Sequence, residues 1–165
     1  MTPRAYPAEV LCRIAALAEA DPDREVCGFV VRPRPGAALE VVALGNALGE
    51  SEGPPGLPAR TRHAYLVDPV GQLQLFRRLR EDGGEVVACY HSHPDGAAAL
   101  SRLDLELAVV EGTPVVPGAE LIVVALAAGR ARAIARFLWN GAQFEAVSLG
   151  LSPLQSPAVR ALGEK

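Results

Sequence analysis

Cysteine is scarce in this sequence, and its spacing argues against two kinds of stabilised fold. The three cysteines, Cys12, Cys27 and Cys89, leave one thiol unpaired in any disulfide scheme, and no two of them are spaced C-x-x-C. A disulfide framework and a cysteine zinc knuckle are therefore not indicated. We expect buried free thiols, because free cysteine is among the residues most often found in protein interiors.

Basic charge and long apolar runs are also lacking. Charged residues make up 21% of the chain and the formal net charge is −3, so no overall basic field is present to hold nucleic acid or an anionic membrane. No apolar run reaches the roughly 18 to 20 residues that a membrane span needs. Residues 1–7 lack the order of a signal peptide. We expect a cytoplasmic protein with neither nucleic acid nor a membrane as a partner.

Hydrophobic residues, in contrast, are plentiful. They make up 50% of the 165 residues, and the chain has no internal repeat. A chain of this length and composition can bury one core without help from disulfides. We therefore expect a single domain over residues 1–150, followed by a tail or a short helix over residues 151–165.

Helix and strand patterns alternate at first and then give way to an antiparallel meander. Helices are predicted at 8–20, 69–80 and 101–111, and strands at 25–31, 39–44, 63–67, 85–90, 120–127, 131–138 and 143–149. The Gly- and Pro-rich stretch 45–62 predicts an exposed loop. In the second helix we expect Leu73, Phe76 and Leu79 to face the core. This order of elements predicts an α/β or α+β fold in which helices cover a sheet.

Two histidines stand at the end of a predicted strand. Because side chains alternate along a strand, His91 and His93 leave the same face of the sheet and can reach one ion. Ten residues separate His93 from Asp104, enough for a loop and a first helical turn to bring a carboxylate back. Two nitrogen ligands, one oxygen ligand and a fourth position for water are typical of a catalytic zinc site, although iron and manganese accept similar ligands.

A hydrolytic metal site also needs a base and a group that stabilises the oxyanion. Glu25 opens an apolar strand, where an acidic side chain is unexpected, and is the candidate general base. The alternative is a solvated carboxylate that merely follows a polar turn. Ser101 precedes Asp104 by three residues, so its hydroxyl lies on the same helix face and can donate to an oxyanion. The alternative for Ser101 is a helix N-cap, and both roles can hold at once.

Two further residues have ligand chemistry. His63 is a third histidine, for which a satisfied position at a strand end is the more common outcome than a metal ligand. Cys89 alternates in phase with His91 and His93, so a fourth ligand stays open. A closed site of four protein ligands, however, leaves no position for catalytic water.

Together these residues resemble the signature of the JAMM metalloproteases, also called JAB or MPN-plus. The resemblance spans residues 8–149 and rests on the strings E-x-C-G-F at 25–29, H-S-H-P at 91–94 and S-R-L-D at 101–104. It implies a curled mixed β-sheet between helices, of the cytidine-deaminase-like kind. It also implies Zn²⁺ on the two histidines and the aspartate, with the glutamate as base and the serine at the oxyanion.

The substrate expectation comes from the resemblance as well. The chain looks most like the stand-alone prokaryotic members, which cleave after the C-terminal Gly-Gly of ubiquitin-like or sulfur-carrier proteins. Such a protein is the expected partner, with the loop 45–62 as the candidate segment that grips it, and a homodimer stays open. The loop at 95–100 lacks the aromatic and proline residues of many members.

Two other functions are considered. A non-catalytic JAB/MPN protein-binding module would keep the fold without the chemistry, but the complete ligand set argues against it. A zinc deaminase needs the strings H-x-E and P-C-x-x-C, and neither occurs in this sequence.

Overall fold

The computed structural model describes residues 4–48 and 64–147. Its elements, in chain order, are α1 (Ala8–Ala20), β1 (Cys27–Arg32), β2 (Glu40–Leu44), α2 (Pro69–Asp82), β3 (Glu85–His93), α3 (Arg102–Ala108), β4 (Val109–Val110), β5 (Thr113–Pro114), β6 (Glu120–Ala127), β7 (Arg130–Trp139) and β8 (Phe144–Val147). Three earlier expectations lie wholly or mostly outside the described residues: the tail or short helix at 151–165, the position of His63, and most of the loop 45–62.

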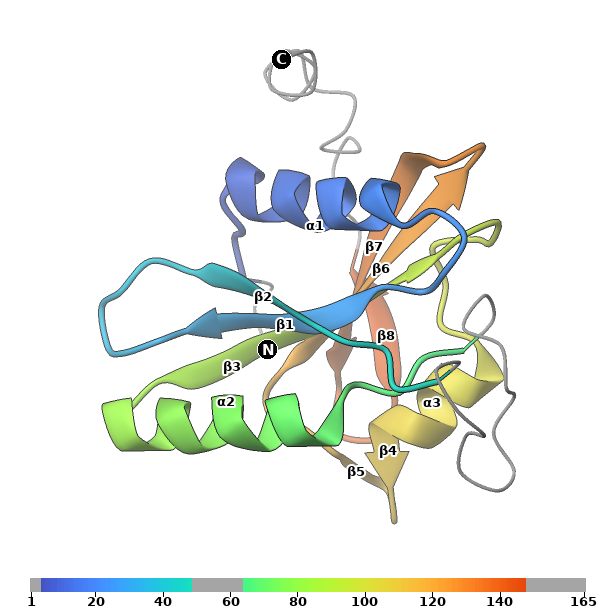
Figure 1. Cartoon of the computed structure of the whole chain (residues 1–165). Helices are drawn as coiled ribbons and strands as arrows, with labels where there is room; N and C mark the ends of the chain where they lie inside the picture. Colours follow the sequence, from blue (N-terminus) through green and yellow to red (C-terminus); the bar gives the residue numbers. More distant parts are fainter. Residues whose placement is uncertain (1–3, 49–63, 148–165) are drawn as a thin grey trace.

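A six-stranded mixed sheet forms the centre of the fold. Its strand order is β2-β1-β3-β6-β7-β8, in which β3 and β6 run parallel and the other neighbours run antiparallel. Helix α1 covers one face of this sheet, and α2 and α3 lie on the opposite side (Figure 1). The expected α/β fold, with a mixed sheet between helices, is therefore confirmed.

The central strands are apolar on both faces, as their position requires. Strand β6 is buried from Glu120 to Leu126, which is the continuous pattern expected of a strand covered on both sides. Ile122 packs in the cluster beneath α1 together with Ile14. Val123 points to the other face and packs in a cluster that includes Leu100, just before α3. Strands β3 and β6 thus form a rigid base for residues at their ends.

Helix α2 begins at the predicted Pro69 and runs to Asp82, two residues past its predicted end. Asp68 accepts hydrogen bonds from the backbone N–H groups of Val70 and Gly71, and Gly83 ends the helix in the left-handed conformation with φ 68°. The expected core face was wrong at one residue, because Leu73 is 60% exposed whereas Leu75 and Leu79 are buried. Leu73 and Leu75 lie about 200° apart around the helix axis, so both cannot face the sheet.

Three predicted elements differ from the structure by more than two residues at one end. Strand β3 continues beyond residue 90 to His93, because β6 pairs with it as far as His93. Residues 64–67 form no strand and make only an isolated bridge between Val67 and Asn46. The helix predicted for 101–111 ends at Ala108, since Glu111 and Gly112 adopt positive φ values of 50° and 74° and turn the chain between β4 and β5.

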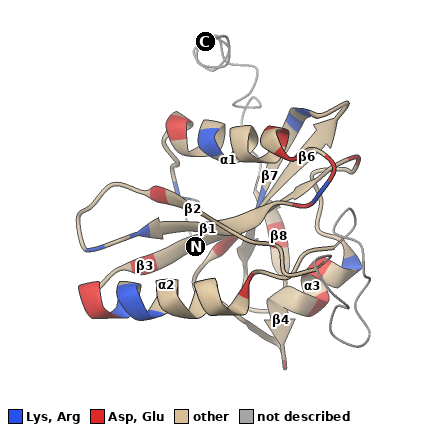
Figure 2. Cartoon of the chain, in the orientation of Figure 1, with Lys and Arg blue, Asp and Glu red and all other residues tan. Residues whose placement is uncertain are grey.

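The distribution of charge agrees with the low net charge. Acidic and basic residues occur together on α1 and on α2, so neither helix presents a single sign (Figure 2). Of the helices in residues 4–48 and 64–147, none combines the length with the apolar content of a membrane span.

Candidate metal centre

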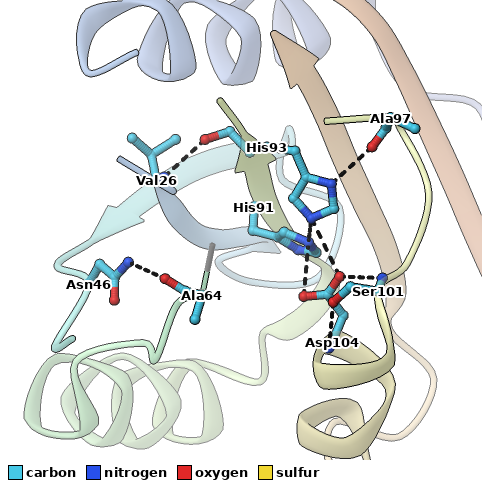
Figure 3. Close-up of polar contacts among 9 residues, drawn as sticks. Val26, Asn46, Ala64, His91, His93, Ala97, Ser101 and Asp104 are labelled. Atoms are coloured by element: carbon cyan, nitrogen blue, oxygen red, sulfur yellow. Dashed lines mark hydrogen bonds and ion pairs between the residues drawn. The ribbon is translucent and has the colours of Figure 1, made fainter. Parts of the chain in front are cut away.

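The two histidines project from the last residues of β3. His91 lies opposite Cys27 of β1 and Val123 of β6, and His93 lies opposite Ala125 of β6, so neighbouring strands hold this segment on both sides at His91. The two Nε2 atoms are 3.1 Å apart (Figure 3). The alternation of side chains along the strand therefore brings both rings together, as predicted.

Asp104 reaches the same point from the first turn of α3. Its two carboxylate oxygens lie 3.4 Å from the Nε2 atoms of His91 and His93, respectively. A reciprocal cap with Ser101 holds the carboxylate. The Ser101 N–H donates to Asp104 Oδ2 at 2.6 Å, and the Asp104 N–H donates to Ser101 Oγ at 3.1 Å. This capping box orients the carboxylate toward the imidazoles.

The donor set fits a divalent metal ion. Ligand atoms of His91, His93 and Asp104 all lie within 4.8 Å of one another, the one such group of three among residues 4–48 and 64–147. The Nδ1 of His93 lies 2.9 Å from the Ala97 carbonyl oxygen, which can only accept, so Nδ1 carries a hydrogen and Nε2 is the ring nitrogen that faces Asp104 and could bind a metal. Two imidazole nitrogens and a carboxylate leave room for a further ligand, as in catalytic zinc sites.

Cys89 does not join this group. It packs instead among apolar side chains that include Phe29 and Val123. Burial raises the pKa of its thiol to about 12, so the thiol is protonated near neutral pH and is a poor metal ligand. The alternative of a fourth protein ligand is thus not supported by the structure.

The charges of the cluster also suit a cation. Burial works to raise the pKa of the Asp104 carboxyl, but its bonds to His91 and His93 outweigh burial and hold the pKa well below its usual range. Asp104 is therefore ionised at neutral pH. Burial lowers the pKa of His91, and the neighbouring carboxylate offsets this only in part. The neutral imidazole is the form that a metal requires. Burial also lowers the pKa of His93, but its contacts with Asp104 and the Ala97 carbonyl outweigh burial and raise the pKa, so a metal would displace a proton from this ring.

Glu25 lies immediately before β1 and is 5% exposed, so the alternative of a solvated carboxylate is wrong. Burial raises its pKa from 4.5 to about 7, the charge of His93 lowers it, and the charge of Asp104 raises it. Its Oε2 atom is buried and has no hydrogen-bond partner among the described residues. This oxygen is buried and electrostatically coupled to two of the cluster residues. Both properties are typical of a carboxylate that acts as a general base.

Two residues near the cluster were not assigned from the sequence. The ring of Tyr65 stacks on the ring of His91, with centroids 4.5 Å apart and planes inclined by 22°. Ser92 is fully buried, and its Oγ accepts a hydrogen bond from the Val26 N–H at 3.0 Å. Strand alternation places Ser92 on the opposite face from both histidines, which is the signal that separates it from them. No pattern in the sequence joins Tyr65 to His91.

A groove of about 520 Å³ borders the base. Its lining includes Glu25, Cys27, Asn46, Asp68 and Tyr90. The groove reaches Glu25 at the end of the sheet where β1 begins and β2 ends, and none of His91, His93 and Asp104 lines it.

Comparison with known proteins gives matches to one family and to related folds. Residues 7–140 match the Prok-JAB family, described as prokaryotic homologs of the JAB domain. Over 43 residues the chain is 42% identical to a Thermus thermophilus protein named "Probable TtuB-protein conjugate cleaving protease". That match covers 26% of this chain and 29% of the relative, so the chain spans less than a third of that protein's length.

Two solution structures resemble the fold. A protein from Desulfitobacterium hafniense has a TM-score of 0.55 and 22% identity, and the match covers 84% of each chain. A protein from Salinibacter ruber has a TM-score of 0.54 and 19% identity, with 93% of this chain and 95% of that chain covered. At these identities the likeness concerns the fold alone.

The family match includes Glu25, both histidines and Asp104, and it covers most of the chain. It confirms the resemblance to the JAB metalloproteases that the sequence motifs indicate. The chain belongs to the prokaryotic JAB-domain family.

Proposed function

We propose that this protein is a zinc-dependent peptidase or isopeptidase that hydrolyses the bond after the C-terminal Gly-Gly of a ubiquitin-like or sulfur-carrier protein. The observation that carries the proposal is the buried cluster of His91, His93 and Asp104 beside an unpartnered Glu25 carboxylate oxygen. The family match and the protease name of the Thermus relative support a peptidase.

His91, His93 and Asp104 would hold the metal. When bound, zinc supplies a Lewis acid that polarises the scissile carbonyl and makes a water molecule acidic near neutral pH. Two features of these residues favour metal binding. Asp104 stays ionised, and the bond from His93 Nδ1 to the Ala97 carbonyl keeps Nε2 turned toward the cluster.

Glu25 would move the proton. Its carboxylate takes a proton from the attacking water and then gives it to the leaving amine. A pKa of about 7 suits both directions of this transfer, because the carboxyl is then protonated and deprotonated with similar ease near neutral pH.

Ser101 would stabilise the oxyanion at the attacked carbonyl. Its Oγ accepts a hydrogen bond from the Asp104 N–H. A hydroxyl that accepts still has its own hydrogen to donate. The capping contact and the oxyanion contact therefore use different parts of the same group.

Two glycines immediately before the cut suit a metal site at the end of a strand, because a backbone without side chains can come close to the metal without clashes. The printed name of the Thermus relative, a protease for conjugates of the protein TtuB, is the support for a ubiquitin-like or sulfur-carrier partner.

The test is a set of fusions. Proteins of the same organism that end in Gly-Gly are extended by a short tail and incubated with the zinc-loaded enzyme, and the products are identified by mass spectrometry. We expect cleavage after the second glycine and none of casein. Cleavage of generic peptides without a glycine preference would overturn the substrate assignment and leave the peptidase assignment standing. Zinc binding without any cleavage would favour the non-catalytic module.

A further inference from the structure

We propose that Asn46 and Ser92 are positioning residues that clamp the peptide group between Glu25 and Val26 and so hold the Glu25 carboxylate at the metal cluster. The proposal rests on the function proposed above for this site. It assigns to these two side chains a task in catalysis although neither of them contacts the reacting atoms.

The clamp grips both ends of one peptide group. The Nδ2 of Asn46 donates to the Glu25 carbonyl oxygen at 3.0 Å. The Oγ of Ser92 accepts from the Val26 N–H at 3.0 Å. Figure 3 shows the dashed contact at Val26, close to the two histidines. Because a peptide group is planar and includes the Glu25 Cα, fixing its oxygen and its N–H fixes the point from which the Glu25 side chain leaves the backbone.

The clamp stands where the sheet no longer holds the chain. Strand β1 begins at Cys27, and the first register pair of β1 and β3 is Cys27 with His91. Glu25 and Val26 precede that pair, so no regular strand pairing orients Glu25. A further hydrogen bond, from the Ser92 N–H to the Val26 carbonyl at 3.0 Å, continues the attachment to β3 by one residue.

Ser92 connects the base to the ligands directly. It lies between His91 and His93 on β3, and its side chain is fully buried on the other face of the strand. Residues 91–93 therefore present the two histidine ligands on one face of β3 and bind the backbone next to Glu25 on the other face. A shift of Glu25 relative to the ligands would have to break this contact.

Asn46 connects the base to the residue behind His91. Its Nδ2 also donates to the Ala64 carbonyl at 3.2 Å, and its Oδ1 accepts from the N–H groups of Leu66 at 3.0 Å and Leu48 at 3.1 Å. The contacts with residues 64 and 66 flank Tyr65, whose ring stacks on His91. All four hydrogen-bonding positions of the amide are thus in use.

These contacts predict which substitutions matter. Aspartate has the shape of asparagine but cannot donate, so Asn46→Asp would place an oxygen against the carbonyl oxygens of Glu25 and Ala64. Ser92→Ala would leave the Val26 N–H without its acceptor, whereas Ser92→Thr keeps a hydroxyl there.

The experiment compares these variants with a matched control, Asn140→Ala. The Asn140 amide also caps a turn with both its groups, donating to Glu145 and accepting from Ala142 and Gln143. It lies between β7 and β8 and contacts no residue of the cluster among those described. Its loss removes a similar set of bonds without touching the clamp.

Four quantities are measured on the full-length protein: zinc content, kcat and KM on a Gly-Gly fusion, and hydrogen exchange at the Val26 amide. For Asn46→Asp and Ser92→Ala we expect kcat to fall at least about tenfold, because small displacements of a catalytic group are costly. KM and zinc content should stay close to wild type, and Val26 should exchange faster. Ser92→Thr should regain most of the kcat, and Asn140→Ala should match wild type throughout. If Asn46→Asp does not fold, Asn46→Ser, which keeps a shorter donor, replaces it with the same expected result.

The outcomes separate the clamp from the proposed function. Folded variants that keep the wild-type kcat, or that lose zinc instead of kcat, would overturn the clamp. If the wild-type protein does not cleave, the proposed function fails, and exchange at Val26 then decides the clamp alone. Unchanged protection of that amide in both variants would overturn it.

Discussion

At the scale of single residues, Glu25 is the side chain with the most unusual environment. A carboxylate is rarely buried without a partner, because removing its charge from water is costly. Glu25 is only 5% exposed, and burial raises its pKa to about 7. Such a site fits a group that exchanges protons during turnover. Two predictions follow from this environment.

The first prediction concerns the role of Glu25 as a base. Glu25→Gln keeps the size of the side chain and removes its ability to take a proton, so turnover should fall at least about a hundredfold. Zinc content should not change, because Glu25 is not one of the three clustered ligand residues. The control is Glu106→Gln, an exposed carboxylate on α3 paired with Arg102, which should leave turnover unchanged. Loss of zinc in Glu25→Gln would make Glu25 a ligand.

The second prediction is a pH dependence of stability in the zinc-free protein. The pKa of Glu25 is raised from 4.5 to about 7, so between these values the folded state holds more protons than the unfolded state. Stability therefore falls as pH rises through this window, by about 3 kcal/mol in total. Glu25→Gln lacks this loss. Urea unfolding at pH 4.5 and pH 8 should show the variant gaining relative to wild type, and a difference independent of pH would contradict the raised pKa.

At the scale of elements, the sequence predicts the cluster of His91, His93 and Asp104 well and the burial of Glu25 only in part. Alternation along β3 and the three-residue spacing of Ser101 and Asp104 are local, so His91, His93 and Asp104 could be placed together before the fold was known. The burial of Glu25 depends on contacts with distant elements, and no local pattern contains it. For the same reason, local apolar residues extended the predicted third helix past Ala108, where the chain instead forms β4 and β5.

The third prediction separates the two roles of Ser101 on α3. Ser101→Ala removes both the helix cap and the hydroxyl donor, and Ser101→Gly removes the donor while glycine keeps a tolerable N-cap. Alanine should cost about 1 kcal/mol of stability and glycine a few tenths. Both should lower kcat about a hundredfold or more, the usual effect of losing one oxyanion donor. Thermal unfolding and kinetics check the two effects, and a kcat that follows stability would leave Ser101 a cap only.

At the scale of the whole molecule, the metal cluster and the largest apolar cluster lie on opposite faces of the sheet. The apolar cluster joins α1 to β1, β3, β6 and β7 and includes Tyr90, whereas alternation along β3 places His91 and His93 on the other face. Folding and metal binding should therefore be separable. The sheet order, with β3 beside both β1 and β6, also had no local signal in the sequence, because it depends on a parallel crossover between strands far apart in the chain.

The fourth prediction follows from this separation. The zinc-free protein should fold, and added zinc should raise its unfolding temperature, since a ligand at a thousandfold excess over its Kd stabilises by about 4 kcal/mol. His93→Ala should fold as well, with an unfolding temperature that zinc does not change. Circular dichroism during heating measures both. Unfolding of the wild-type protein on chelation would show that the metal is needed for the fold.

The most direct measurement for the whole account is the metal content of the protein. Elemental analysis of the chain after zinc reconstitution and removal of free metal should give one equivalent of zinc in wild type and in Glu25→Gln. The variants His91→Ala and His93→Ala should lose most of their zinc and remain folded. A wild-type content well below half an equivalent would contradict the assignment of His91, His93 and Asp104 as a zinc site, and with it the proposed chemistry.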